Sequence, residues 1–367
     1  MTDTNLLDIA ERRGPFGVVY VDASHDTADA ARQWDLRIRS VREKLAAAGA
    51  SEGMLRRFDR AVGEGPPGRG RVGRLLVLDD EKVHADEYLP DPPAREVVRV
   101  SPLPYLIPLL RQHSSLIPHV VAVVDRVGCD LRTVDEHGAA TERVVEEHPY
   151  AVHKTGGGAW SHRSMQKRVE ETTRRTIGEL AGEVAAAADT VHAEVIVVAG
   201  EVAARSALHE ALPGSGPTIV EVEAGSRAAG SDHDELAAAV DEVIAAEVHR
   251  HEDEVLTRLA VELGRDEGLA VVGLGPTTAA LRTANVERLL IDPDRLGDRM
   301  VQVGAERAQV IAETGAPASW SGNTAHRQTC RADEALPVAA LLVGAEVSTV
   351  AGGLPSEDGV AAVVRHR

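Results

Sequence analysis

The chain has 367 residues and a hydrophobic fraction of 43%, a composition typical of a globular protein with two or three domains. A net charge of −18 argues against a protein coated in nucleic acid, and no apolar run reaches the roughly 18 residues of a membrane-spanning helix. The N-terminus lacks a signal-peptide pattern, and Cys129 and Cys330 are too few for a disulfide framework. We therefore expect a cytoplasmic protein without disulfides, bound neither to DNA nor to membranes.

The first block, residues 1–114, mixes strand-like and helical patterns. A strand is expected over residues 16–24, followed by two helices. Gly49 predicts the end of the first helix, and Ser51 predicts the cap of the second. The prolines of residues 101–113 prevent one continuous helix there.

The second block, residues 115–250, has the alternation of an α/β domain. Two apolar strands around a glycine-containing turn predict a hairpin over residues 119–138. Apolar residues every three or four positions predict a helix over 161–188, and buried strands are expected at 194–201 and 218–225.

The third block, residues 251–367, is entered through a long helical pattern at 231–268, which Ser231 can cap. Residues 335–352 are strand-like, and residues 314–336 are expected to form a mobile loop. The predicted fold class is therefore α/β, with three domains that each contain a mixed sheet and packed helices.

The stretch "GLGPTT" (273–278), with Asp292 further on, imitates a dinucleotide-binding fingerprint. Pro276 interrupts the phosphate loop, and Thr278 stands where a third small residue belongs. A glycine-proline turn with Thr277 capping a helix is the favoured interpretation, and we expect no cofactor.

The histidines do not have the spacing of a metal site. "HRH" at 249–251 lies within a predicted helix, where rings two residues apart point in different directions, and neither a cysteine pair nor HExxH accompanies it. We expect solvated or RNA-facing histidines and no metal. Neither a nucleophile elbow nor a Walker motif is present, and no residue is assigned a catalytic role.

One segment combines features that suit structured RNA: "AVHKTGGGAWSHRSMQKRVEETTRR" (151–175). Residues 153–175 carry six basic and two acidic residues, whereas residues 176–250 have a net charge of −11. Glycines allow close backbone approach, Trp160 can stack on a base, and basic side chains can contact phosphates. The predicted rRNA-binding residues are His153, Lys154, His162, Arg163, Lys167, Arg168, Arg174 and Arg175.

The first block has a basic cluster of its own, around the "GRGRVGR" stretch. A solvated loop beside an amphipathic helix is an equal alternative to a nucleic-acid contact. The residues concerned are Arg56, Arg57, Arg60, Arg69, Arg71 and Arg74.

The hairpin, the glycine loop, the basic helix and the strand "AEVIVVAGE" together resemble the middle domain of archaeal and eukaryotic release factors and of Pelota. The first block resembles their N-terminal domain, which lies at the decoding centre. The stretch "VGLGPTTAALRTANVERLLIDPD" resembles the start of their C-terminal domain, which contacts a translational GTPase. Among bacterial proteins, the layout is similar to the Balon family of ribosome hibernation factors, which act in stress.

Two family motifs are absent. Catalytic release factors carry Gly-Gly-Gln at the loop tip, whereas here Gly157 and Gly158 are followed by Ala159. The nearest glutamine, Gln166, lies within the predicted helix, and "AAAGAS" (46–51) stands where Asn-Ile-Lys-Ser would read stop codons.

The resemblance implies a factor that fills the vacant A site of an idle 70S ribosome without hydrolysing peptidyl-tRNA. Its loop would reach the peptidyl-transferase centre, and the first block with its arginine cluster would lie at the decoding centre. The resemblance also suggests elongation factor Tu as a partner. The loop residues are Gly156, Gly157, Gly158, Ala159 and Trp160. Two alternatives stay open: a rescue hydrolase that cleaves peptidyl-tRNA through glycine amides, and a partner-binding protein with no ribosomal role.

Overall fold

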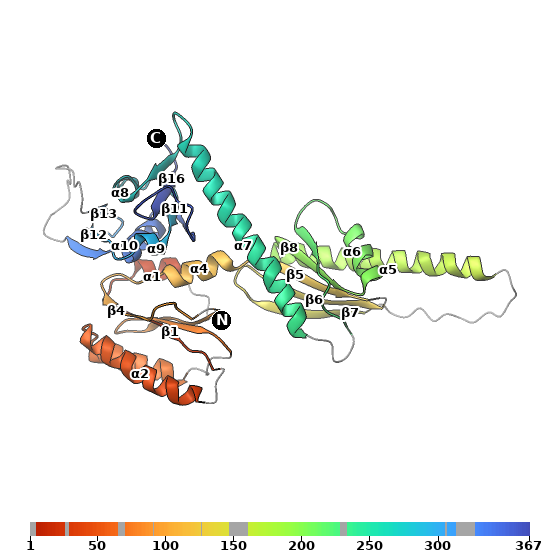
Figure 1. Cartoon of the computed structure of the whole chain (residues 1–367), viewed down its shortest axis with the longest axis horizontal. Coiled ribbons are helices and arrows are strands. Elements are labelled where there is room, and N and C mark those ends of the chain that lie inside the picture. The colour runs from red at the N-terminus through yellow and green to blue at the C-terminus, as the bar shows by residue number, and fades with distance from the viewer. Residues whose placement is uncertain are drawn as a thin grey trace. The chain divides into compact units, whose positions relative to one another are not determined.

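The computed structural model is a mixed α/β protein (Figure 1), as the sequence predicts. It divides into two compact units: residues 1–114 with residues 252–367, and residues 115–251. The prediction of three domains, 1–114, 115–250 and 251–367, stays a prediction. The residues described are 5–25, 29–64, 70–90, 92–125, 127–146, 161–227, 233–304, 307–312 and 327–367, with only the backbone described for 64, 146, 161–174, 233, 311 and 312.

The N-terminal part of the first unit is an antiparallel sheet in the order β3-β2-β1-β4. Its strands are β1 (Phe16–Asp22), β2 (Gly73–Leu78), β3 (Val83–Leu89) and β4 (Val97–Ser101). Three helices accompany the sheet: α1 (Leu6–Glu11), α2 (Ala30–Ala47) and α3 (Glu52–Glu64). A fourth, α4 (Ile107–Ser115), begins after Pro102 and Pro104 and has Pro108 in its first turn, so residues 101–113 do not form one continuous helix, as expected.

The junction between α2 and α3 forms as the sequence predicts. Gly49 has a φ of +95°, a conformation that glycine adopts without steric cost. The Ser51 hydroxyl accepts the Met54 N–H at 3.0 Å, which caps α3. Met54 and Leu45 then reach the same core, between these helices and the sheet.

The C-terminal part of the first unit contains two sheets, in the orders β10-β16-β11-β15 and β13-β12-β14. Among the described strands of these two sheets, only β11 and β15 pair in parallel. The strands are β10 (Ala270–Val272), β11 (Val286–Ile291), β12 (Met300–Val303), β13 (Val310–Ala312), β14 (Gln328–Arg331), β15 (Glu346–Thr349) and β16 (Val360–Val364). The helices are α8 (Leu274–Arg282), α9 (Pro293–Leu296) and α10 (Ala332–Leu342).

Two expectations for this part are partly wrong, and the strand expected within residues 335–352 forms only as β15. Residues 335–342, expected to be strand-like, belong to α10, which is buried along most of its length and therefore lacks the polar face that marks a helix in sequence. The expected loop at 314–336 contains β14 and the start of α10 in its described part, while residues 314–326 lie outside the described residues.

The "GLGPTT" stretch forms a helix start whose anionic partner comes from this chain. Helix α8 begins at Leu274, and the Leu274 N–H donates to Asp358 Oδ2 at 3.1 Å. Thr277 does not cap it, contrary to expectation, because its buried hydroxyl lies inside the helix and has no hydrogen-bond partner. Asp292 caps α9 by accepting from Asp294 and Arg295. The carboxylates of Asp358 and Asp292 thus accept hydrogen bonds from the N–H groups at the starts of α8 and α9, where a dinucleotide-binding fold would use such groups for its ligand.

The first and last parts of the chain share one core. Helix α1 packs against α10, and Phe16 and Leu336 belong to the same buried cluster. At its edge, Arg99 Nη1 lies 3.1 Å from Asp333 Oδ2 and 3.2 Å from Glu334 Oε1. Ser101 donates a short hydrogen bond to Glu334. Residues some 230 positions apart are therefore joined by packing and by charge.

The second unit is built on one five-stranded sheet, β7-β6-β5-β8-β9. Strands β5 (His119–Val124), β6 (Gly128–Val134) and β7 (Ala140–Glu146) are antiparallel, which confirms the predicted hairpin, while β8 (Val195–Gly200) and β9 (Thr218–Glu221) continue from β5 in parallel. Helices α5 (Ser161–Val191) and α6 (Val202–Ala211) cover one face, and α7 (His233–Leu263) covers the other (Figure 1).

Helix α7 contributes to two cores in succession. Leu236, Ile244 and Val248 pack on the sheet of the second unit. Further along, Leu256 and Leu259 join the core around β11 and β16 of the first unit. The predicted long helix is thus confirmed, whereas its predicted cap, Ser231, lies outside the described residues.

Both cysteines are free, in line with the expected lack of disulfides, and both are buried. Burial raises the pKa of the Cys129 thiol to about 12 and that of the Cys330 thiol to about 11. Within the described residues, no helix combines the length and apolar character needed to cross a bilayer.

The burial of Glu334 gives the first unit a specific pH dependence. Burial, and then the charge of Asp333, raise the pKa of the Glu334 carboxyl above its ordinary 4.5. A raised carboxyl pKa stabilises the fold fully below the unfolded pKa, and this contribution is lost as the pH rises through the folded pKa. We predict that the stability difference between wild type and Glu334→Gln falls as the pH rises from 4 to 7, measured by urea unfolding; a constant difference would contradict it.

Candidate functional site

The predicted loop lies between β7 and α5 of the second unit. Residues 147–160 lie outside the described residues, so the assignments of His153, Lys154 and the tip residues Gly156, Gly157, Gly158, Ala159 and Trp160 stay predictions. What the structure describes is the pair of elements that hold the two ends of this segment, edge strand β7 and helix α5.

Helix α5 is anchored by its second half. Ile177, Leu180, Ala181 and Val184 are buried, and the last three pack in the core beneath the sheet with Val198 of β8. The helix runs from Ser161 to Val191, three residues beyond the expected end. The basic residues lie in the first half, before the buried stretch begins.

The cationic side chains of that first half are only partly described. Arg175 is exposed and lies 3.6 Å from Glu179 one turn on, a surface pair of small energetic value. For the remaining predicted contacts, the structure gives a helical backbone and no side-chain positions: His162, Arg163, Lys167, Arg168 and Arg174.

The arginine cluster of the N-terminal part is not one continuous surface. Arg56, Arg60 and Arg71 are exposed, whereas Arg57 Nε donates to Asp80 O at 2.7 Å beside the start of α3. Arg69 lies outside the described residues.

Arg74 is the member of this cluster for which the prediction is wrong. It is 1% exposed, and its guanidinium makes a two-pronged contact to Asp86, with both N–O distances at 2.8 Å. It also donates to Ala61 O and lies over the Tyr88 ring. Burial alone lowers the pKa of Arg74, but Asp86 outweighs this effect and raises it, so the buried group stays charged. Arg74 therefore ties α3 to the sheet and does not face rRNA.

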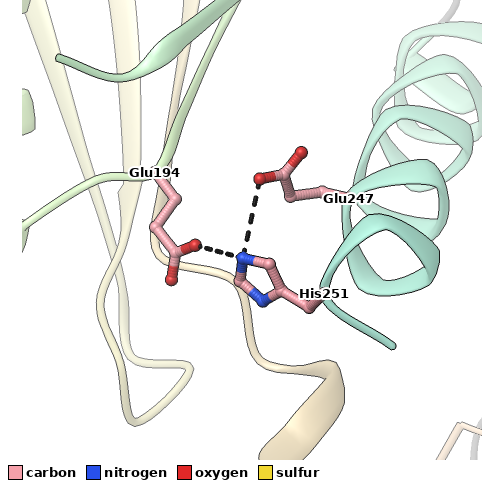
Figure 2. Close-up of side chains that lie close together, drawn as sticks. All are labelled: Glu194, Glu247 and His251. Atoms are coloured by element: carbon pink, nitrogen blue, oxygen red, sulfur yellow. Dashed lines mark ion pairs between the residues drawn. The ribbon is translucent and has the colours of Figure 1, made fainter. Parts of the chain in front are cut away.

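A second polar cluster, absent from the sequence predictions, lies in the second unit (Figure 2). His251 Nε2 lies 2.8 Å from Glu194 Oε2 and 3.7 Å from Glu247 Oε1. The hydrogen bond from Arg250 holds the pKa of Glu247 below its ordinary value, although burial opposes it. His251 is thus paired with carboxylates, contrary to the expectation of a solvated or RNA-facing side chain.

The signal for this cluster was present in the sequence. Glu247 and His251 are four residues apart, a spacing that puts two side chains on one face of a helix. The cluster has neither a cysteine pair nor an HExxH motif, and its third member, Glu194, is 53 residues before Glu247.

Sequence comparisons place this architecture among known proteins. Residues 118–265 match the model of "Bacterial archaeo-eukaryotic release factor family 2". The whole chain is 31% identical to the uncharacterized protein Rv2629 of Mycobacterium tuberculosis, over 97% of that protein. The molecule is therefore a bacterial relative of the archaeal and eukaryotic release factors. It belongs to the bacterial archaeo-eukaryotic release factor family.

The solved structures that resemble this chain have lower sequence identity to it. An archaeal Pelota from a ribosome-bound model has 14% identity and a TM-score of 0.41, covering 100% of this chain and 96% of that one. Saccharomyces cerevisiae Dom34, described as a translation termination-like factor, has 10% identity and a TM-score of 0.40 over 80% of this chain and 79% of that one. TM-scores this low do not support a conclusion about family or function, so the family assignment rests on the sequence comparisons.

The structural role of Arg74 can be tested through its partner. Asp86→Ala leaves a buried guanidinium without its carboxylate, which costs about 3 kcal/mol in the free energy of unfolding. Asp59→Ala is the matched control, because it breaks the exposed Arg42–Asp59 pair and costs less than about 1 kcal/mol. Equal losses in urea unfolding would show that the Arg74–Asp86 pair is not a structural clamp.

Proposed function

We propose that this protein is a ribosome-binding translation factor that occupies the vacant A site of idle 70S ribosomes, as a hibernation factor. The observation that carries the proposal is the substitution at the loop tip within a release-factor family member. Ala159 follows Gly157 and Gly158, where catalytic members carry glutamine.

The absent glutamine argues for binding without hydrolysis. In catalytic release factors, the glutamine helps to place the water that attacks the peptidyl ester, and an alanine methyl group can neither donate nor accept a hydrogen bond. Gln166 cannot replace it, because it lies six positions into α5. The loop would fill the peptidyl-transferase centre, and Trp160 would stack on an rRNA base.

The distribution of charge supports an orientation in which the loop and the start of α5 face rRNA. The basic half of α5 directly follows the loop, whereas residues 176–250 have a net charge of −11. A polyanion attracts the first and repels the second, so only one end of the unit suits rRNA.

The two remaining blocks would meet different surfaces. Exposed Arg56, Arg60 and Arg71 would face the decoding centre, with Arg74 serving as internal support. The C-terminal block would face protein, and elongation factor Tu is the partner that the family resemblance suggests. The same resemblance suggests that the protein acts in the stress response, as the Balon hibernation factors do.

A rescue hydrolase is the second candidate, favoured by one observation. Gly156, Gly157 and Gly158 remain in the loop, and their backbone amides can bind a water or an oxyanion without any side chain.

Incubation with 70S ribosomes that hold labelled peptidyl-tRNA separates the two candidates. We expect the protein to sediment with vacant 70S particles and to release no peptide above the buffer rate. Ala159→Gln, which restores the catalytic tripeptide, is the informative variant, because release by it alone would place the loop at the ester. Steady release by the wild type, lost in Gly157→Ala, would overturn the hibernation function.

The basic half of α5 is tested through salt dependence. Replacing Arg163, Lys167 and Arg168 with alanine should weaken ribosome binding and reduce the slope of log K against log salt by about 2 to 3, if each contacts one phosphate. The control removes three exposed cations of the C-terminal block and should leave the slope unchanged: Arg258, Arg265 and Arg367. A slope unchanged in the α5 variant would remove this helix from the interface.

A further inference from the structure

We propose that Glu194, Glu247 and His251 form a zinc-binding site that joins α7 to the sheet of the second unit (Figure 2). The site is separate from the proposed ribosome contacts and does not depend on them.

The first ligand is fixed by the sheet. Glu194 directly precedes β8, its N–H donates to Pro118 O at 2.8 Å, and its carbonyl accepts the Thr218 N–H at 2.8 Å. Both backbone groups are thus held by segments on either side of β8. A carboxylate on such a backbone has only its own side-chain rotations left, which reduces the entropy lost on metal binding.

The other two ligands come from consecutive turns of α7. Glu247 and His251 are four residues apart and therefore lie on one face of the helix. Glu247 is 7% exposed, and Ile244 and Val248 pack on the sheet next to it. The hydrophobic contact sets the distance between α7 and β8, and so the distance between the ligands.

The three side chains converge closely enough for one ion. Their ligand atoms lie within 4.8 Å of one another, from two elements distant in sequence. Zinc bonds of about 2.0–2.1 Å in a tetrahedron place ligand atoms roughly 3.3 Å apart. The 2.8 Å and 3.7 Å separations from His251 Nε2 lie on either side of that value. Small side-chain rotations are therefore enough to admit the ion.

The donor set favours zinc over magnesium or calcium. Those hard cations take oxygen ligands, whereas an imidazole nitrogen with two carboxylates is a borderline set that suits zinc. Arg250 Nε donates to Glu247 Oε1 at 3.0 Å, an outer contact that orients the carboxylate. With three protein ligands, a fourth position stays open to water.

The chain also contains a matched control pair. His209 Nδ1 lies 2.7 Å from Glu221 Oε1, as close as the His251–Glu194 contact, but within the described residues no third metal-ligating side chain completes it. If His251 were only an ion-pair partner, the two histidines would behave alike towards zinc.

The experiment is a calorimetric titration of the metal-free full chain with zinc chloride. We expect one saturable site whose affinity falls at least about tenfold in His251→Ala and in Glu194→Ala, and stays at the wild-type value in His209→Ala. Cobalt in place of zinc should give the visible absorption of a tetrahedral site, lost in the same two variants. Circular dichroism establishes that each variant is folded.

Two results would overturn the proposal. One is zinc binding that His251→Ala and Glu194→Ala leave unchanged. The other is a wild-type chain without a saturable site, which would leave the cluster as an ion pair only. Neither result bears on ribosome binding, because sedimentation with 70S particles is measured without added zinc.

Discussion

The parallel pairing of β5 with β8 is the constraint on which the second unit depends. Two parallel neighbours cannot be joined by a tight turn, so the chain must leave the sheet and return over its face. Here the connection includes β6, β7, the glycine-containing segment and α5. Its return is fixed at Gly200, whose φ is +108° and where a Cβ atom would lie 2.1 Å from Val124 O. The proposed functional segment is thus part of the crossover that the sheet requires.

Local signals in the sequence predicted the elements wherever one residue type decides the backbone. The hairpin at β5 and β6, the Ser51 cap and the lack of one continuous helix over residues 101–113 are all confirmed. The prediction was wrong for α10, because a helix buried on nearly every side has no polar period to reveal it. Thr277 was misassigned for a related reason: the residue that caps α8 is Asp358, which is 84 positions after Leu274, the first residue of the helix.

Only the part of the site whose residues are adjacent in the sequence could be predicted from it. The basic run that opens α5 is visible in the sequence, and the helix is confirmed there. Charge alone does not distinguish a solvated arginine from a buried one, and the burial of Arg74 depends on Asp86 across a strand pair. The cluster of Glu194 with Glu247 and His251 requires the docking of α7 on the sheet, a tertiary event that no spacing rule includes.

The burial of the two cysteines has a practical consequence. Thiolates are the reactive form, and with thiol pKa values of about 12 and about 11, Cys129 and Cys330 are almost entirely protonated at neutral pH. Maleimide dyes will therefore react only slowly with the two native thiols while the chain stays folded. A single cysteine introduced at an exposed position can then be labelled selectively with a fluorophore, without removal of Cys129 and Cys330.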